Sequence, residues 1–219
     1  MQPKILTVDD SPADHPCASA KLYDCDLPLL NYLLQDLRAL MRRSAAGELE
    51  ITPHQNFCWD VHGLNRRTIV CDPEVLKHSI DVKVVGFFGD RRAKVDLEEV
   101  DAIEFGLHEE FKRYPGILSY SSAELVDDQW VDLVVHRDST DREAWRESEI
   151  HRHAVAQLAP KMYHSVRIHN GCILGGPIGS ESVIIETTKY WDYDTDPVWH
   201  AFRELPQGAI EVVTEHIAD

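Results

Sequence analysis

The first third of the chain carries one clear helical pattern. Over residues 28–43 the leucines recur three and four positions apart, which is typical of a helix that buries one face. Asp26 stands where a side chain caps the first turn of such a helix. Around this helix we predict a short strand at residues 4–8, and a hairpin of two strand-like runs between residues 56 and 71.

The rest of the chain alternates strands with helices. Residues 82–89 are rich in β-branched and aromatic side chains and predict a strand, and a helix follows over residues 96–113. Pro115 and Gly116 end that helix, because proline lacks the backbone donor and glycine tolerates a reversal. The later predicted elements are strands at 117–125 and 130–138, a helix from Ser139 or Thr140 to about Leu158, strands at 164–174 and 182–191, a short helix near 197–204 and a strand-like run at 209–215.

This order of elements predicts the fold class. From residue 82 onward it reads strand, helix, strand, strand, helix, strand, with one strand added. A βαββαβ order is that of the ferredoxin-like unit, so we expect an α+β protein with an antiparallel sheet. The helices of such a unit cover one sheet face, and the other face needs a partner layer, often a second copy. We therefore divide the chain into an N-terminal extension or degenerate ferredoxin-like half (1–80), a ferredoxin-like domain (81–195) and a C-terminal tail (196–219).

Composition narrows the classes of partner. Asp and Glu outnumber Lys and Arg by 38 to 22, which gives a formal net charge of −16. This charge repels phosphate backbones and anionic lipid, so we expect neither a nucleic acid nor a membrane as partner. The sequence shows no apolar stretch of the ~18–20 residues that span a membrane and no signal-peptide pattern. Five cysteines without CxxC spacing indicate reduced thiols, which are typical of the cytoplasm.

Residues 82–175 also resemble a known family. Three features carry the resemblance: Pro115-Gly116 after the first helix, Trp130 at the start of a strand, and a helix that bears Trp145, Ser148 and His151. In these features the chain resembles the dimeric α/β-barrel superfamily, and most of all its antibiotic-biosynthesis-monooxygenase-like branch. The resemblance implies a homodimer in which two sheets pack face to face, with a pocket for a small molecule inside the barrel or between sheet and helices.

The same resemblance implies several activities. The superfamily includes cofactor-independent monooxygenases, haem-degrading oxygenases, haem-dependent peroxidases and members without known activity, and a shared fold does not select among them. A tryptophan such as Trp145 presses on the haem in the haem-degrading branch, and an axial histidine follows on the same helix. The interval from Trp145 to His151 is shorter than in that branch, and this favours Trp145 as a hydrophobic anchor of the helix.

His151 is the first candidate for catalysis. Ser148, His151 and Val155 share one face of the predicted helix, which should pack toward the sheet. A half-buried imidazole there has a pKa in the range that suits a general base. The alternative is a core histidine that bonds to a backbone carbonyl.

Strand periodicity supplies the other candidates. Trp130, Asp132 and His136 alternate on one face of their strand, and Arg167 and His169 share a face of a later strand. Tyr120 shares a face with Ser122 on the neighbouring strand. These side chains would form a polar cluster in one cavity, or else face solvent or a dimer interface. The remaining histidines show no metal-ligand spacing, so we expect no metal.

Two functions follow. The first is an oxygenase-like enzyme acting on a small aromatic, polyketide-like or tetrapyrrole substrate, either without a cofactor or with haem. In it His151 or His136 is the base, Arg167 and His169 hold an anionic oxygen, and the walls are Tyr120, Trp130 and Trp145. With haem, one of the histidines becomes the axial ligand and Arg167 a propionate partner. The alternative is a non-catalytic, small-molecule-binding or stress-associated dimeric barrel.

Overall fold

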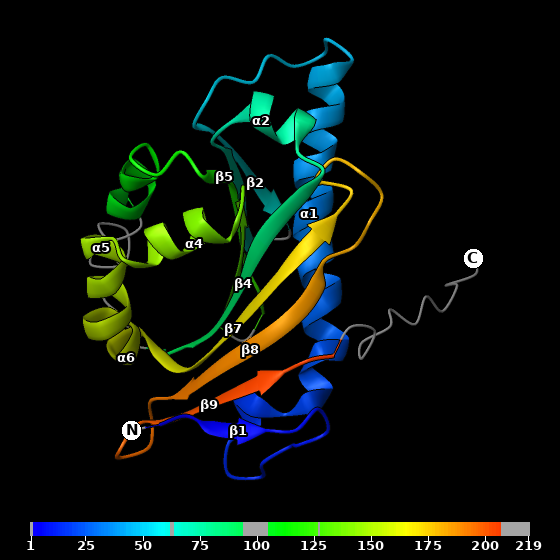
Figure 1. Cartoon of the computed structure of the whole chain (residues 1–219). Helices are drawn as coiled ribbons and strands as arrows, with labels where there is room; N and C mark the ends of the chain where they lie inside the picture. The colour runs from blue at the N-terminus through cyan, green and yellow to red at the C-terminus, as the bar shows by residue number, and fades with distance from the viewer. Residues whose placement is uncertain (1, 62–63, 94–104, 127, 207–219) are drawn as a thin grey trace.

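Nine strands form a single sheet in the computed structural model, which describes residues 2–61, 64–93, 105–126 and 128–206. The strands are β1 (Lys4–Leu6), β2 (Gln55–Val61), β3 (Leu64–Val70), β4 (Asp81–Arg91), β5 (Ile117–Glu124), β6 (Gln129–His136), β7 (Tyr163–Leu174), β8 (Ile184–Asp192) and β9 (Trp199–Glu204). Their order across the sheet is β1-β9-β8-β7-β4-β6-β5-β3-β2 (Figure 1). β1 runs parallel to β9, whereas the other neighbouring pairs are antiparallel, so the sheet is mixed.

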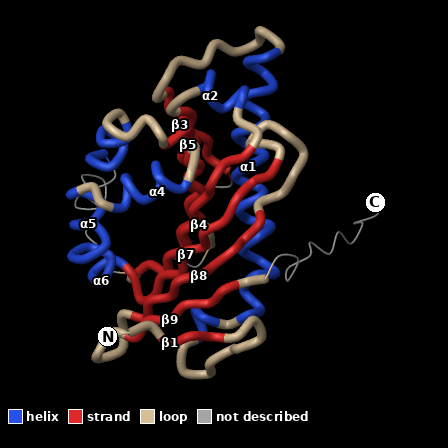
Figure 2. Tube along the Cα trace, viewed as in Figure 1, coloured by secondary structure: helices blue, strands red, loops and turns tan. Residues whose placement is uncertain are grey.

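Helices cover both faces of this sheet. The helical elements are η1 (Pro16–Ala18), η2 (Ala20–Leu22), α1 (Tyr23–Ala45), α2 (Pro73–His78), α4 (Ser139–Arg146), α5 (Glu149–His153), the π-helical turn η3 (Ala154–Leu158) and α6 (Ala159–Met162). Residues 105–111 are also helical. Figure 2 shows α1 along one face of the sheet and α4, α5 and α6 on the other. No described helix is both long enough and apolar enough to cross a membrane.

The mixed sheet corrects the predicted fold class. We expected an antiparallel ferredoxin-like sheet of the dimeric α/β-barrel type, and this is wrong. The difference arises largely from segments outside the resemblance, because β2 and β3 extend the sheet beyond β5, and β9 and β1 extend it beyond β8. α1 comes from residues 1–80 and covers the face for which we expected a second copy. Burial of that face therefore does not need one, and the homodimer stays a prediction.

The leucine pattern of α1 folds as a buried helical face. Leu30 and Leu34 are both 0% exposed and pack in the main core with side chains of β4, β5 and β6. The helix begins at Tyr23, earlier than predicted, and Asp26 does not cap it. Asp26 lies within α1, and its carboxylate is buried against the sheet, where it binds side chains of β7 instead of backbone amides.

Two further elements differ from the predictions. The helix expected up to Leu158 is divided at Ser148, whose backbone is extended and whose hydroxyl accepts a hydrogen bond from the His151 amide, which starts α5. The short helix expected near 197–204 is wrong, because residues 199–204 pair with β8 and β1 as strand β9. The start of the predicted 96–113 helix and the predicted run at 209–215 lie outside the described residues.

Candidate ligand-binding cavity

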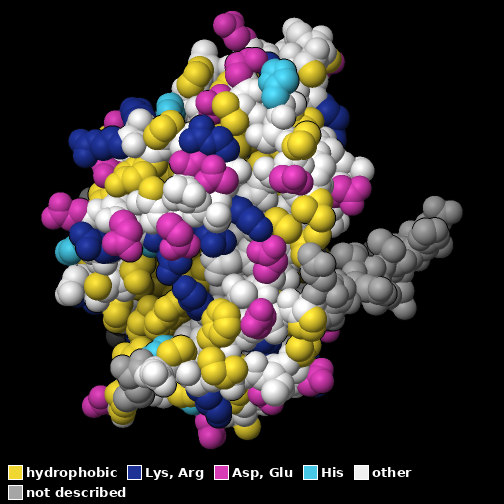
Figure 3. All heavy atoms as spheres, in the orientation of Figure 1, with side chains coloured by type: hydrophobic (Ala, Val, Ile, Leu, Met, Phe, Trp, Pro, Cys, Tyr) yellow, Lys and Arg dark blue, Asp and Glu magenta, His cyan; other side chains and the backbone are white. Residues whose placement is uncertain are grey.

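A cavity of about 310 Å³ lies between the sheet and the layer of α4 to α6. Its floor is the centre of the sheet, where side chains alternate in burial along each strand. On β4, Val84 and Phe88 face α1 and are 1% and 2% exposed, whereas Val85 and Phe87 face the cavity and are only half-buried. Figure 3 shows the corresponding hydrophobic hollow, bordered by Lys and Arg side chains. The helices therefore leave the middle of the sheet partly uncovered.

Aromatic rings form much of the cavity wall. The Phe111 ring lies 5.3 Å from the Trp145 ring and 5.4 Å from the Tyr120 ring, measured between centroids. Trp145 is 7% exposed, and its ring lies 5.3 Å from the Phe111 ring and 5.3 Å from the Tyr114 ring. Rings fixed in this way present flat apolar surfaces that do not have to be ordered when a ligand binds.

A carboxylate stands among these rings. Asp132 Oδ1 accepts hydrogen bonds from the Tyr120 hydroxyl at 2.9 Å and from Trp130 Nε1 at 2.7 Å. The Arg67 guanidinium lies over both rings, 5.7 Å from Tyr120 and 6.0 Å from Trp130. The alternation of Trp130, Asp132 and His136 on β6 thus places all three in the cavity lining, as the strand pattern predicts.

His136 is the most deeply buried titratable group of the lining. Its side chain is 1% exposed, and within the described residues its Nδ1 atom has no hydrogen-bond partner. Burial, with a smaller contribution from the nearby Arg142 and His151, lowers the pKa of His136 to about 3. The imidazole is therefore neutral near pH 7.

His151 lines the same cavity from α5. Burial lowers the pKa of His151, although the backbone carbonyl of Arg146 opposes this shift by accepting a hydrogen bond from the imidazole. Its ring lies 5.3 Å from the Trp145 ring, so the histidine and the tryptophan pack together. Two neutral imidazoles, His136 and His151, therefore face one apolar space, and each has the capacity to accept a hydrogen bond.

Sequence reasoning missed four basic residues of the lining. Arg142 and Arg146 come from α4, Lys189 comes from β8, and His108 comes from the helical segment 105–111. Burial lowers the pKa of His108 to about 4. Two signals were available in the sequence: Arg142 and Arg146 are one helical turn apart, and Lys189 alternates with Trp191 on one strand face.

Arg167 and His169 do not reach this cavity. They share a strand face, as predicted, but that face of β7 packs against α1, whereas Ile168 and Asn170 line the cavity. The expected cluster of His136, His151, Arg167 and His169 in one space is therefore wrong. The sheet itself separates the two pairs.

The second group forms a closed network with α1. Arg167 Nε and Nη2 donate to the two Asp26 oxygens at 2.6 Å each, and His169 Nε2 donates to Asp26 Oδ2 at 2.9 Å. Burial alone raises the pKa of Asp26, but the hydrogen bonds from Arg167 and His169 outweigh it and hold that pKa low. Burial also lowers the pKa of His169, so the imidazole is neutral.

The neighbouring hydroxyl groups fit this protonation state. Arg203 Nη1 donates to Tyr190, which is 2.8 Å from the Tyr23 hydroxyl, and Tyr23 is in turn 2.6 Å from Thr188. Thr188 Oγ1 lies 2.8 Å from His169 Nδ1. If each hydroxyl donates to the next group, the chain ends on an unprotonated Nδ1. Because these side chains are almost wholly buried, the network is part of the core and not a binding site.

Haem does not fit the predicted arrangement. Arg167, the expected propionate partner, is held by Asp26 on the far side of the sheet from the candidate axial histidines. The residues proposed to hold haem therefore do not form one site. Among the described residues, no three His, Cys, Asp or Glu side chains are grouped to hold a metal ion.

Comparison with known proteins gives little further guidance. No family model and no curated protein matches the chain. The crystal structure of protein SO0527 from Shewanella oneidensis is similar over 44% of this chain and 95% of its own, with 13% identity and a TM-score of 0.39. This likeness is too slight to carry an argument, so the resemblance to the monooxygenase-like branch stays a prediction, and no family is assigned to this chain.

Proposed function

We propose that this protein binds a small aromatic molecule with a ring hydroxyl group in the cavity between the sheet and α4 to α6. The observation that carries the proposal is the uncovered sheet centre, where Val85, Phe87 and Val134 are only half-buried. Protein interiors are otherwise close-packed. An apolar hollow of this size leaves the side chains that line it without the packing contacts that a core supplies. A hollow that keeps so much apolar surface uncovered favours a ligand.

The chemistry of the lining supports an aromatic ligand with a hydroxyl group. Flat rings such as Phe111 and Trp145 offer surfaces for stacking, and the volume lies at the small end of ligand pockets. Neutral His136 and His151 are available to accept a hydrogen bond from a hydroxyl. In an apolar surrounding, such a bond contributes orientation as well as affinity.

A cavity-filling variant tests this proposal. We expect 2-naphthol to bind the wild-type protein in a calorimetric titration, and Val134→Phe to weaken binding at least tenfold by occupying the floor. Val126→Phe is the matched control, because Val126 is 69% exposed and lies outside the cavity. No binding to the wild type, or equal binding to a folded Val134→Phe variant, would overturn the proposal.

An oxygenase-like activity is the second candidate, and the His151 geometry favours it. His151 lines the cavity beside Trp145, and burial lowers its pKa, so a neutral imidazole is available to take a proton from a bound hydroxyl. The resulting anion would add dioxygen at a ring carbon, and the O–O bond of this peroxide would then break to leave a ring carbonyl and release the second oxygen atom as water, with the substrate supplying the electrons. Oxygen consumption with a quinol, lost in His151→Ala, supports this activity. A colourless protein without oxygen uptake excludes both this route and a haem-dependent one.

We also infer that the protein works in a reducing compartment such as the cytoplasm. All five cysteines are free thiols. Burial raises the pKa of Cys17 to about 11 and of Cys71 to about 12, so neither is a reactive thiolate. Thiol titration of protein isolated under non-reducing conditions should find five free groups, and fewer would contradict the inference.

A further inference from the structure

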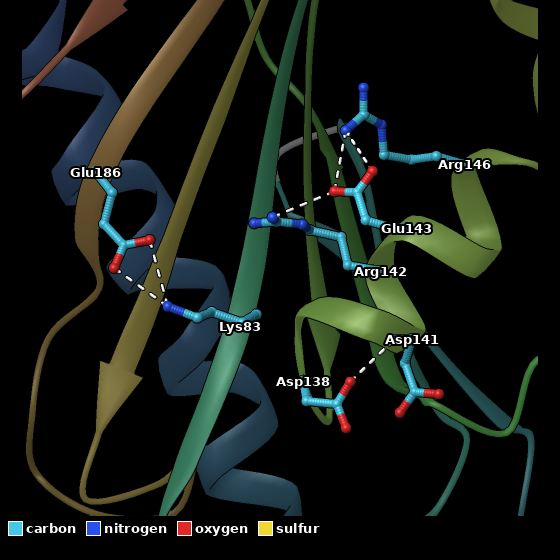
Figure 4. Close-up of polar contacts among 7 residues, drawn as sticks. All are labelled: Lys83, Asp138, Asp141, Arg142, Glu143, Arg146 and Glu186. Carbon is cyan, nitrogen blue, oxygen red and sulfur yellow. Dashed lines mark hydrogen bonds and ion pairs between the residues drawn. The ribbon is translucent and has the colours of Figure 1, made fainter.

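Three cations gather on one side of the cavity. Arg142 and Arg146 reach the lining from α4, and Lys189 reaches it from β8. Glu143 is the carboxylate beside them, 3.3 Å from Arg142 Nη2 and 2.9 Å from Arg146 Nη1. Figure 4 shows Glu143 between the two arginines, with Arg142 extending toward the sheet. Positive charge is therefore in excess at this side, in a chain whose formal net charge is −16.

Lys189 is the one of these three cations that has no ion pair among the described residues, although the charge of Glu143 acts on it at longer range. Its side chain is half-buried and forms no hydrogen bond or ion pair among the described residues. Lys83, on a nearby strand, shows the contrast, because its ammonium group lies 3.2 Å from Glu186 (Figure 4). A half-buried ammonium group without a partner is costly unless a ligand supplies the opposite charge.

Arg142 offers a second unused donor. Its Nε atom is buried and, within the part of the chain that the structure describes, has no hydrogen-bond partner. The Nη2 contact to Glu143 is long at 3.3 Å, so the guanidinium is only weakly engaged. Arg142 and Lys189 are also close enough for their charges to interact.

The other charged group of the lining is the carboxylate of Asp132. Asp132 accepts hydrogen bonds from Tyr120 and Trp130 on β5 and β6, in the neighbourhood of Arg67. The cavity therefore has an apolar aromatic floor, a hydroxyl-accepting histidine pair and a cationic side.

We infer that the natural ligand is an aromatic carboxylate, whose ring lies on the sheet floor and whose carboxylate group binds Arg142 and Lys189. A carboxylate carries the single negative charge and the two acceptor oxygens that these two donors require. This inference rests on the proposed binding function and specifies the class of ligand. It assigns Arg142 and Lys189 to ligand recognition.

Paired probes of equal shape separate charge from burial. We would titrate 2-naphthoate and the neutral 2-naphthamide into wild-type protein by calorimetry. The inference predicts at least tenfold tighter binding of the carboxylate, with an advantage that shrinks as salt is raised. Arg142→Gln and Lys189→Gln should each reduce naphthoate affinity about tenfold and naphthamide affinity much less.

Two further variants complete the test. Arg152→Gln removes the same charge from an exposed position on α5 that does not line the cavity, and should leave both affinities unchanged. Glu143→Gln removes the competing carboxylate, and should tighten naphthoate binding severalfold. A purely structural role for these side chains would not produce this opposite sign.

The outcomes distinguish this inference from the proposed function. Equal affinity for the two probes would overturn the carboxylate inference while leaving the cavity as a binding site. An equal loss of affinity for the two probes in a folded Arg142→Gln variant would also overturn it, because the arginine would then act only in packing. Failure of both probes to bind would overturn the inference and the proposed function together.

Discussion

Arg167 binds Asp26 through two hydrogen bonds, each 2.6 Å long, on the sheet face that α1 covers. Asp26 is 0% exposed and Arg167 is 8% exposed, so the pair lies in the core. The sequence suggested that four side chains share one cavity, but they lie on opposite faces of the sheet. Arg167 and His169 bind α1 to β7, whereas His136 and His151 face the cavity. The first group should govern stability, and the second ligand binding.

Removal of the Asp26 carboxylate tests the structural role of this pair. Asp26→Ala leaves the buried Arg167 guanidinium without its counter-ion, and such a loss typically costs ~3–5 kcal/mol of unfolding free energy. Urea denaturation measures the change. Glu109→Ala is the control, since it breaks a half-exposed ion pair with Lys112 and should cost at most about 1 kcal/mol. Equal effects of the two variants would rule out the assigned role.

The folded protein should lose stability as the pH falls from 6.5 toward 3. His136 has its pKa lowered from 6.5 to about 3, mainly by burial. Between these values the unfolded chain binds a proton at this site that the folded chain does not bind. His136→Gln should therefore flatten the pH dependence of the unfolding free energy over this window, by up to a few kcal/mol at its acid end. An unchanged slope in the variant would contradict the assignment.

Asp26 should act over a more acid range. Because its pKa in the folded state is below the ordinary value of 3.8, its contribution is present above that value and is lost as the pH falls further. Asp26→Asn should therefore reduce the steepness of acid unfolding below about pH 4. Unchanged steepness below about pH 4 in this variant would count against the account.

Gly171 tests the close approach of β7 and β8. A Cβ atom at this position would lie 1.9 Å from the Ile184 carbonyl oxygen, which belongs to the backbone and cannot turn aside. We expect Gly171→Ala to lower the unfolding free energy by about 1–3 kcal/mol. Gly106→Ala is the matched comparison, because its Cβ would meet only the Ile150 Cδ1 atom at 2.9 Å, at the end of a side chain, in a helical segment. It should be neutral or stabilising, and the reverse order would refute the packing described.

Periodicity predicted which side chains share a face, but not which layer covers that face. The alternation on β6 correctly grouped Trp130 with His136, and the alternation on β7 correctly grouped Arg167 with His169. Whether a strand face meets α1 or the α4–α6 layer depends on contacts between distant segments, which strand periodicity does not contain. The catalytic roles first suggested for His136 and His151 stay predictions, whereas Arg167 and His169 do not reach the cavity in which they would act.

Local signals misled where tertiary contacts competed with them. Asp26 has the side chain of a helix cap, yet the buried Arg167 and His169 bind it more favourably than backbone amides would. The helical spacing predicts Ser148 on the face of one continuous helix. A serine also caps the start of a helix, and Ser148 does so at the start of α5. Residues 199–204 become a strand because β8 and β1 offer their edges on both sides.

Methyl resonances of the sheet provide the most direct test of the binding cavity. Val85, Val134 and Ile168 face the cavity, whereas Val84 on β4 and Val131 and Leu133 on β6 face α1. When 2-naphthol is titrated into methyl-labelled protein, the account predicts large, saturable shifts of the first three and small shifts of the other three. Shifts confined to the α1 face or to the outer surface, or none at all, would contradict it.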